Sequence, residues 1–255
     1  MALKNVVRDI EPLLRTQGRL IRLHRSARVA FIGDIHGDLD AVDRVFSLLG
    51  SPDTVLVFLG DIVDRGPASS ECLERILRAK AERPDHVFLL MGNHEAWGEA
   101  TFRPADFWGS LSDAETALIA PTLLQLPYAA QHESGILALH GALPDVCSLD
   151  EIDRIPLGST AWRDITWGDW TDRRAERESG SGRPCYGLDE FSTRVARLGI
   201  RVLVRSHQPD APRYLFGDRC LTLFTSHAYG AQRQAAVLPK GRGVRTARDM
   251  ELIEI

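Results

Sequence analysis

The amino-acid sequence predicts an α/β fold in which two β-sheets pack face to face and helices cover their outer faces. In the first half of the chain, apolar runs of five or six residues alternate with segments of helical periodicity, which is typical of parallel strands joined by crossover helices. In the second half, short strand-like runs dominate. The 255 residues are 44% hydrophobic and 26% charged, which is the composition of a globular protein with one sizeable core.

Three buried strands and two helices are predicted in the first half. The strands are expected at residues 28–32, 54–59 and 86–91, each of them an apolar run. The helices are expected at residues 39–49 and 70–83, because each has apolar residues on one face and is followed by a glycine or a proline. The order strand–helix–strand–helix–strand therefore predicts a parallel sheet.

A helical insertion or cap is expected at residues 96–130, and beyond it the strands are short. These strands are predicted at residues 136–139, 202–204, 214–216, 221–224 and 235–238. A helix at residues 189–198 interrupts them, and residues 172–183, charged and then rich in glycine and serine, are expected to form a flexible surface loop. We expect residues 1–255 to form a single domain.

An amphipathic helix is predicted at the N-terminus. Its apolar stripe consists of Val6, Ile10, Leu13 and Leu14. Packing of this stripe against the domain is the expected use of such a face.

Composition excludes several classes of protein. Lys and Arg number 31 against 35 Asp and Glu, a net charge of −4, and no basic block is present, so no nucleic-acid partner is expected. Apolar runs fall far short of the roughly 18 residues of a membrane span, and the charged N-terminus does not resemble a secretion signal. The four dispersed cysteines fit reduced thiols. We therefore expect a cytoplasmic protein with no membrane partner.

The predicted strands end in motifs that combine glycine with polar side chains. These motifs are GDIHG at residues 33–37, GDIVDRG at 60–66, GNHE at 92–95, HGA at 140–142 and RSH at 205–207. Ligands of α/β sheets bind at the carboxyl ends of strands, and glycine permits the sharp turns needed there. A single Gly-Asp at a strand end is usually only a turn. Four of the eight histidines lie in these five motifs, which favours one shared site.

The donor atoms of these motifs suit divalent metal ions. Carboxylate, amide and imidazole ligands in this mixture are typical of Mn²⁺, Fe²⁺ or Zn²⁺ sites. Six such ligands exceed the four of a tetrahedral zinc site. Two metal ions about 3.5–4 Å apart that share one carboxylate would use all of them.

The ordered motifs resemble those of the phosphoprotein phosphatase family of serine/threonine phosphatases, within the calcineurin-like metallophosphoesterases. The resemblance extends from Ala27 to Tyr229 and includes LPYAA at residues 126–130. It implies a metallophosphoesterase-like two-sheet sandwich with the metal site at the carboxyl ends of the strands. It also implies a phosphorylated protein or peptide as substrate, and hydrolysis by direct attack of a hydroxide that bridges two metal ions. The resemblance favours Mn²⁺, with Fe or Zn as alternatives.

Residue by residue, the resemblance assigns roles to eleven side chains. The implied metal ligands are Asp34 and His36 for the first ion, Asp61 as the bridge, and Asn93, His140 and His207 for the second. His94 is implied as the acid that protonates the leaving oxygen, with Asp64 orienting it. The implied phosphate-binding residues are Arg65, Asn93, Arg183 and Tyr229.

Some segments depart from the family pattern. HGA replaces HGG, Trp-Gly-Asp at residues 167–169 replaces a WSDP-like motif, and the segment before Tyr229 is one residue shorter. Arg183 lies in a poorly matching loop, where a solvated charge is an equally good interpretation.

Two further functions remain as alternatives. A symmetrical dinucleoside polyphosphate (diadenosine tetraphosphate) hydrolase would share the scaffold, but such relatives tend to lack the aspartate of DRG and to carry GNHD. Asp64 and Glu95 therefore favour the phosphatase. A catalytically silent metal-binding scaffold would show gaps among the ligands or in the acid pair, and the motifs show none. The sequence gives no indication of the oligomeric state.

Overall fold

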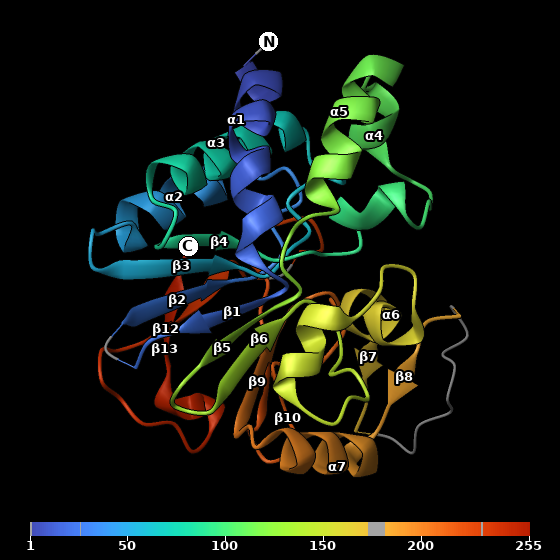
Figure 1. Cartoon of the computed structure of the whole chain (residues 1–255). Coiled ribbons are helices and arrows are strands. Elements are labelled where there is room, and N and C mark those ends of the chain that lie inside the picture. The colour runs from blue at the N-terminus through green and yellow to red at the C-terminus, as the bar shows by residue number, and fades with distance from the viewer. Residues whose placement is uncertain (1, 26, 173–181, 231) are drawn as a thin grey trace.

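The structure is a computed structural model that describes residues 2–25, 27–172, 182–230 and 232–255. Two sheets form its centre (Figure 1). The strands of the first sheet, in spatial order, are β13 (Glu251–Glu254), β12 (Gln234–Leu238), β2 (Arg28–Ile32), β3 (Thr54–Phe58) and β4 (Val87–Leu89). Strands β2, β3 and β4 are parallel to one another, and β12 is antiparallel to β2. The carboxyl ends of β2, β3 and β4 therefore lie at the same edge of the sheet.

The second sheet has six strands and packs against the first. Their spatial order is β1 (Leu20–Leu23), β5 (Ala129–His132), β6 (Ile136–Leu139), β9 (Val202–Arg205), β11 (Cys220–Thr222) and β10 (Tyr214–Leu215). Strands β6, β9 and β11 are parallel. A separate ladder pairs β7 (Asp169–Trp170) with β8 (Cys185–Tyr186).

Alternating side chains of the strands form the core between the sheets. The apolar cluster at this interface includes Val29, Phe31, Val55, Val57, Ile136, Ala138, Val202 and Val204. Intervening residues such as Ala30, Leu56 and Leu137 belong to a second cluster that includes residues of the helices. Successive side chains point to opposite faces of a strand, and both faces are buried here, so central strands such as β3 and β6 are continuous apolar runs.

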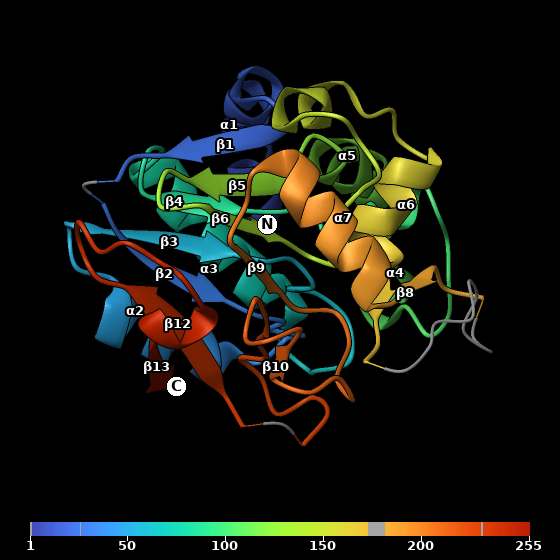
Figure 2. The same ribbon diagram turned by 90° about the horizontal axis from the view of Figure 1, so that it is seen from below.

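Helices cover the outer faces of both sheets. Helices α1 (Ala2–Gln17), α2 (Leu39–Leu49) and α3 (Ser69–Glu82) lie on the side of the first sheet (Figure 1). In the view from below, α7 (Leu188–Leu198) lies beside β9 (Figure 2). The predicted N-terminal stripe is confirmed, since Val6, Ile10 and Leu14 are buried and α1 contacts α3 and α5 (Asp113–Leu123).

The segment after β4 is helical and irregular. It contains the 3₁₀ turn η1 (Glu95–Gly98) and helices α4 (Asp106–Ser110) and α5. A capping box between Ser112 and Glu115 begins α5. This segment leads into β5 and lies beside the carboxyl end of β4.

Every predicted strand and helix is present, with ends within two residues of those expected. Strands β1, β5, β7, β8 and β13 and helix α6 (Thr160–Trp167) were not predicted from the sequence. The turns η2 (Leu149–Arg154) and η3 (Ala247–Asp249) were not expected either. Of the expected flexible loop at 172–183, residues 173–181 lie outside the described part. Among the described residues, no helix is both long and apolar enough to cross a membrane.

Candidate metal centre and active site

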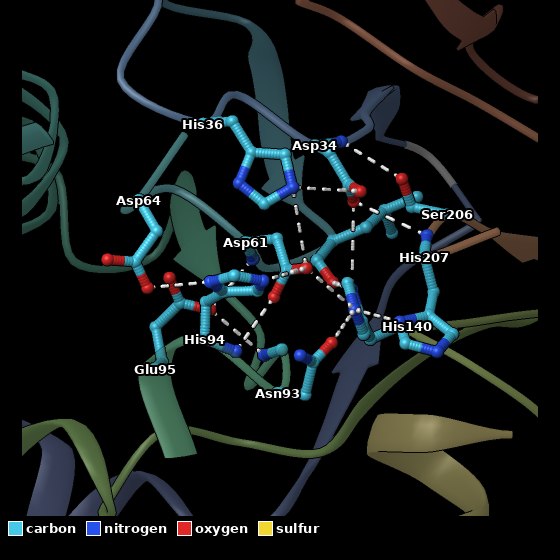
Figure 3. A network of polar contacts seen from close by, with 12 residues as sticks. Asp34, His36, Asp61, Asp64, Asn93, His94, Glu95, His140, Ser206 and His207 are labelled. Atoms are coloured by element: carbon cyan, nitrogen blue, oxygen red, sulfur yellow. Dashed lines mark hydrogen bonds and ion pairs between the residues drawn. The ribbon is translucent and has the colours of Figure 1, made fainter. Parts of the chain in front are cut away.

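The polar motifs of five strand ends meet at one place. Asp34 follows β2, Asp61 follows β3, Asn93 follows β4, His140 follows β6 and His207 follows β9. Figure 3 shows these side chains pointing toward one another from both sheets. Convergence of segments so far apart in the sequence means that the fold, and not one local motif, builds the site.

Tight turns place the side chains. His36, Asp61, Asp64, Arg65 and His207 have φ of 46°, 52°, 66°, 72° and 70°, a left-handed conformation that costs a non-glycine residue of order 1 kcal/mol or more. The chain offsets this cost with short backbone hydrogen bonds. The Asp61 carbonyl accepts the N–H groups of Ile35 at 3.0 Å and His36 at 2.9 Å, which ties the first two motifs together.

Glu95 fixes the turns after β3 and β4, a role that the sequence analysis missed. Its buried carboxylate accepts the backbone N–H groups of Asp61 at 2.7 Å, Ile62 at 2.8 Å and Gly92 at 3.1 Å. Burial raises the pKa of Glu95, as does the negative charge of Asp61, while the hydrogen bonds from Ile62 and Asp61 oppose the rise. In the sequence, the only indication of such a carboxylate is the pair of Gly-Asp and Gly-Asn turns, whose backbone N–H groups need an acceptor.

Asp61 lies between two groups of potential ligands. Its Oδ2 atom is 3.7 Å from His36 Nε2 and 3.8 Å from His94 Nε2 on one side, and 3.3 Å from His140 Nε2 on the other. His140 Nε2 is in turn 3.1 Å from His207 Nδ1. Ligand atoms that share an ion at ~2.1 Å lie ~3.0–3.4 Å apart. The two separations at His140 fall in this range, and the separations of 3.7 and 3.8 Å from His36 and His94 exceed it slightly.

The remaining expected ligands lie in the same cluster. Asp34 Oδ2 is 3.6 Å from His36 Nε2, and Asn93 Oδ1 is 3.2 Å from His140 Nε2. Among the residues that the structure describes, two groups of His and Asp ligand atoms, each within 4.8 Å, could hold an ion. Both contain Asp61: His36, Asp61 and His94 form one, and Asp61, His140 and His207 form the other.

Unsatisfied polar atoms at the centre fit bound metal ions. His36 Nδ1 contacts the Val63 carbonyl at 2.9 Å and His140 Nδ1 contacts the Leu59 carbonyl at 3.0 Å. If each Nδ1 carries the proton, each Nε2 presents its lone pair to the centre. Asp34 Oδ2 and His36 Nε2 are buried and have no hydrogen-bond partner among the described residues. Buried polar atoms are normally satisfied, and a cation would satisfy these.

Electrostatics favours the metal-binding charge states at Asp61 and His207, whereas at the buried His36 and His140 neighbouring carboxylates outweigh burial and raise the pKa. Burial would raise the pKa of Asp61, but His140, His94 and His36 hold it well below its usual value. Burial and the neighbouring His140 and Arg183 hold the pKa of His207 well below its ordinary value, so His207 is neutral at pH 7. For His36, burial opposes protonation, but Asp34 and Asp61 outweigh it and raise the pKa to about 9. A bound cation would compete with that proton.

His94 and Asp64 form a buried pair beside the centre. His94 Nδ1 lies 2.6 Å from Asp64 Oδ2, and both residues are at most 3% exposed. This contact fixes the ring so that Nε2 faces Asp61, as Figure 3 shows. The backbone N–H of Phe107 donates to the other oxygen of Asp64 at 2.7 Å.

A small cavity of about 110 Å³ opens onto this centre. Its lining includes Arg65, Asn93, His94, Arg183 and Tyr229, together with Asp61, Phe102, Arg103, Trp167 and His207. The structure thus brings every expected phosphate-binding residue to one cavity. Arg103 was not expected there.

Arg183 and Tyr229 both line the cavity but contact different residues. Arg183 lies 5.7 Å from the Trp167 ring and 4.0 Å from Asp169 Oδ2, and Asp169 Oδ1 is 3.7 Å from His207 Nε2. The Tyr229 ring is 5.5 Å from the His36 ring and 43% exposed. Both therefore lie where they could contact a phosphate above the metal ligands.

Comparison with known proteins identifies the family. Residues 27–211 match the profile of the calcineurin-like phosphoesterases, and the chain belongs to this family. It is 29% identical over 242 residues to human serine/threonine-protein phosphatase 5, covering 89% of this chain and 47% of that protein. It is 28% identical over 233 residues to the Drosophila melanogaster serine/threonine-protein phosphatase 6 catalytic subunit, covering 84% and 75%.

A solved structure shares the fold. The protein serine/threonine phosphatase from Saccharomyces cerevisiae with similarity to human phosphatase PP5 superimposes with a TM-score of 0.83 at 20% identity, covering 99% of this chain and 89% of that one. The chain spans about half the length of the first curated relatives that it matches, 44–47% of each.

Proposed function

We propose that this protein is a metal-dependent phosphomonoester hydrolase that removes phosphate from phosphoserine and phosphothreonine in proteins. The observation that carries the proposal is the convergence of buried ligand atoms from five strand ends around Asp61, next to the His94–Asp64 pair. The similarity to serine/threonine phosphatases over most of this chain supports the substrate class.

The proposed cofactors are two divalent cations, with Mn²⁺ as the preferred metal. Asp34 and His36 would hold the first, Asn93, His140 and His207 the second, and Asp61 both. When bound, the cations would neutralise phosphate charge and acidify a water molecule that serves as the nucleophile. This is needed because a phosphate monoester carries roughly −1.5 to −2 charges near neutral pH and repels hydroxide.

The side chains around the cavity would do the remaining work. Arg65 and Arg183 would bind the phosphate oxygens, since guanidinium groups match them bidentately. His94 would donate a proton from Nε2 to the departing serine oxygen, a step worth about 10²–10⁴ in rate. Asp64 would hold the His94 ring in place through its contact with Nδ1. Hydrolysis would occur in one step, without a phosphoenzyme.

A substrate panel tests the proposal. The metal-loaded protein should release phosphate from phosphoserine and phosphothreonine peptides with a higher kcat/KM than it shows on diadenosine tetraphosphate. The reverse preference would replace the proposal with the dinucleoside polyphosphate hydrolase. Failure to cleave any phosphomonoester, activated aryl phosphates included, would favour the silent scaffold.

We also propose a cytoplasmic location and protein substrates only, without nucleic acid. All four cysteines, Cys72, Cys147, Cys185 and Cys220, are free, as expected in a reducing compartment. The net charge of −4 gives no attraction to a polyanion.

A further inference from the structure

The short helix α4 is joined by hydrogen bonds to both members of the His94–Asp64 pair. Phe107 N–H donates to Asp64 Oδ1 at 2.7 Å. The next residue, Trp108, donates from its indole Nε1 to the His94 carbonyl at 2.9 Å. With the 2.6 Å contact between His94 Nδ1 and Asp64 Oδ2, these bonds close a ring through four residues. All four are at most 3% exposed, so water does not compete for these bonds.

Hydrogen bonds from three directions fix the orientation of His94. Its backbone N–H donates to Asp61 Oδ1 at 3.0 Å, its carbonyl accepts from Trp108, and its imidazole contacts Asp64. In addition, the Phe102 ring lies edge-to-face on the imidazole at 4.5 Å. Trp108, like Asp64, is not among the residues that line the cavity, and its indole donates to the backbone carbonyl of His94.

We propose that Trp108 is a positioning residue that holds His94 in the geometry needed to protonate the leaving oxygen. This inference rests on the proposed function. Proton donation requires the donor within hydrogen-bond reach of the leaving oxygen, and small displacements reduce rates strongly. Loss of the Trp108 bond frees the His94 carbonyl and loosens the peptide that carries the ring.

Trp97 provides a matched control. The two indoles stack with centroids 5.2 Å apart and planes at 12°, so both pack in the same aromatic cluster. The Nε1 atom of Trp97 is buried but has no hydrogen-bond partner among the described residues. Trp97→Phe and Trp108→Phe therefore remove the same atoms from one stack, and only Trp108→Phe breaks a bond to His94.

The test compares the dependence of rate on the leaving group. In Trp108→Phe, kcat for a phosphoserine peptide should fall about tenfold, the order expected for one lost hydrogen bond. Hydrolysis of an activated aryl phosphate, whose leaving group needs no proton, should change less than about twofold. Trp97→Phe should leave the ratio of the two rates as in the wild type. Equal losses on both substrates, or the same selective loss in Trp97→Phe, would overturn the proposal.

A double-mutant cycle and a spectroscopic measurement cover the case of poor activity or folding. In an Asp64→Asn background, Trp108→Phe should lower kcat for the phosphoserine peptide by less than it does in the wild type, because both residues position the His94 imidazole. If the two substitutions lower kcat independently, so that their effects add in full, the proposal is contradicted. In histidine-labelled protein, the slowly exchanging Nδ1–H proton of His94 should be lost in Trp108→Phe and kept in Trp97→Phe. Retention of this proton signal in both variants would also overturn the proposal. A wild-type protein inactive on both esters would instead refute the proposed function.

Discussion

Replacement of Gly92 by alanine tests the metal centre at its bridging ligand. A Cβ at this position would lie 2.2 Å from Oδ1 and 2.5 Å from the backbone N of Asp61, and 2.8 Å from Glu95 Oε2. Real Cβ contacts essentially never fall below 3.0 Å, so the Asp61 carboxylate or the backbone at residue 92 must move by about 0.8 Å. Metal–ligand distances tolerate only about 0.2 Å. We therefore expect Gly92→Ala to lose bound metal and activity together.

The variant should remain folded, because overpacking of a buried site costs about 1–3 kcal/mol against a typical stability of about 5–15 kcal/mol. Elemental analysis of desalted protein measures the metal content, and circular dichroism measures folding. Gly243→Ala is the matched control, since a Cβ there meets nothing within 4 Å. Full metal content and wild-type activity in Gly92→Ala would refute the placement of Asp61 as the shared ligand.

Three further substitutions test other parts of the molecule. His94→Ala should lower kcat by about 10²-fold or more on phosphoserine peptides and far less on activated aryl phosphates, with unchanged metal content; equal losses would contradict its role as the acid. Asp61→Asn should deplete both metals and remove the rise in Tm that Mn²⁺ gives the wild type, which differential scanning calorimetry can check. Burial lowers the pKa of Lys80 from 10.5 to about 8, only partly opposed by Asp85. The buried ammonium destabilises the fold until it loses its proton, so the free energy of unfolding should rise between pH 8 and 10.5 by at most about 3 kcal/mol relative to Lys80→Met. Urea titrations at both pH values measure the free energy of unfolding. If this interpretation is wrong, the difference between the wild type and Lys80→Met will be the same at pH 8 and pH 10.5.

The strand ends could be predicted from the sequence because their signals are local. A buried apolar run followed by Gly-Asp or Gly-Asn marks both the strand and the turn, and parallel strands bring such turns to one edge. Asp34, Asp61 and Asn93 were predicted together for this reason, and the structure brings them together.

Other features depend on contacts between distant segments and carry no local signal. Strand β1 pairs in parallel with β5, so Leu20 lies beside Ala129, and four residues of LIRL are too few to indicate a strand. Trp108 donates to His94, 14 residues earlier in the chain, and stacks on Trp97. From the sequence, a tryptophan in a helical segment predicts packing alone. The Glu95 carboxylate accepts hydrogen bonds from the turns after β3 and β4. Its position in the GNHE motif does not indicate these contacts.

Seven non-glycine residues in the described part of the chain have a positive φ, and five of them lie at the site. Their left-handed conformation has a consequence for how the sequence can vary. At His36, Asp61, Asp64, Arg65 and His207, glycine would relieve backbone strain, so selection of a random library for thermal resistance alone should enrich glycine there. Selection for turnover should eliminate it. Sites where the two screens disagree in this way would outline the reaction centre without any knowledge of its substrate.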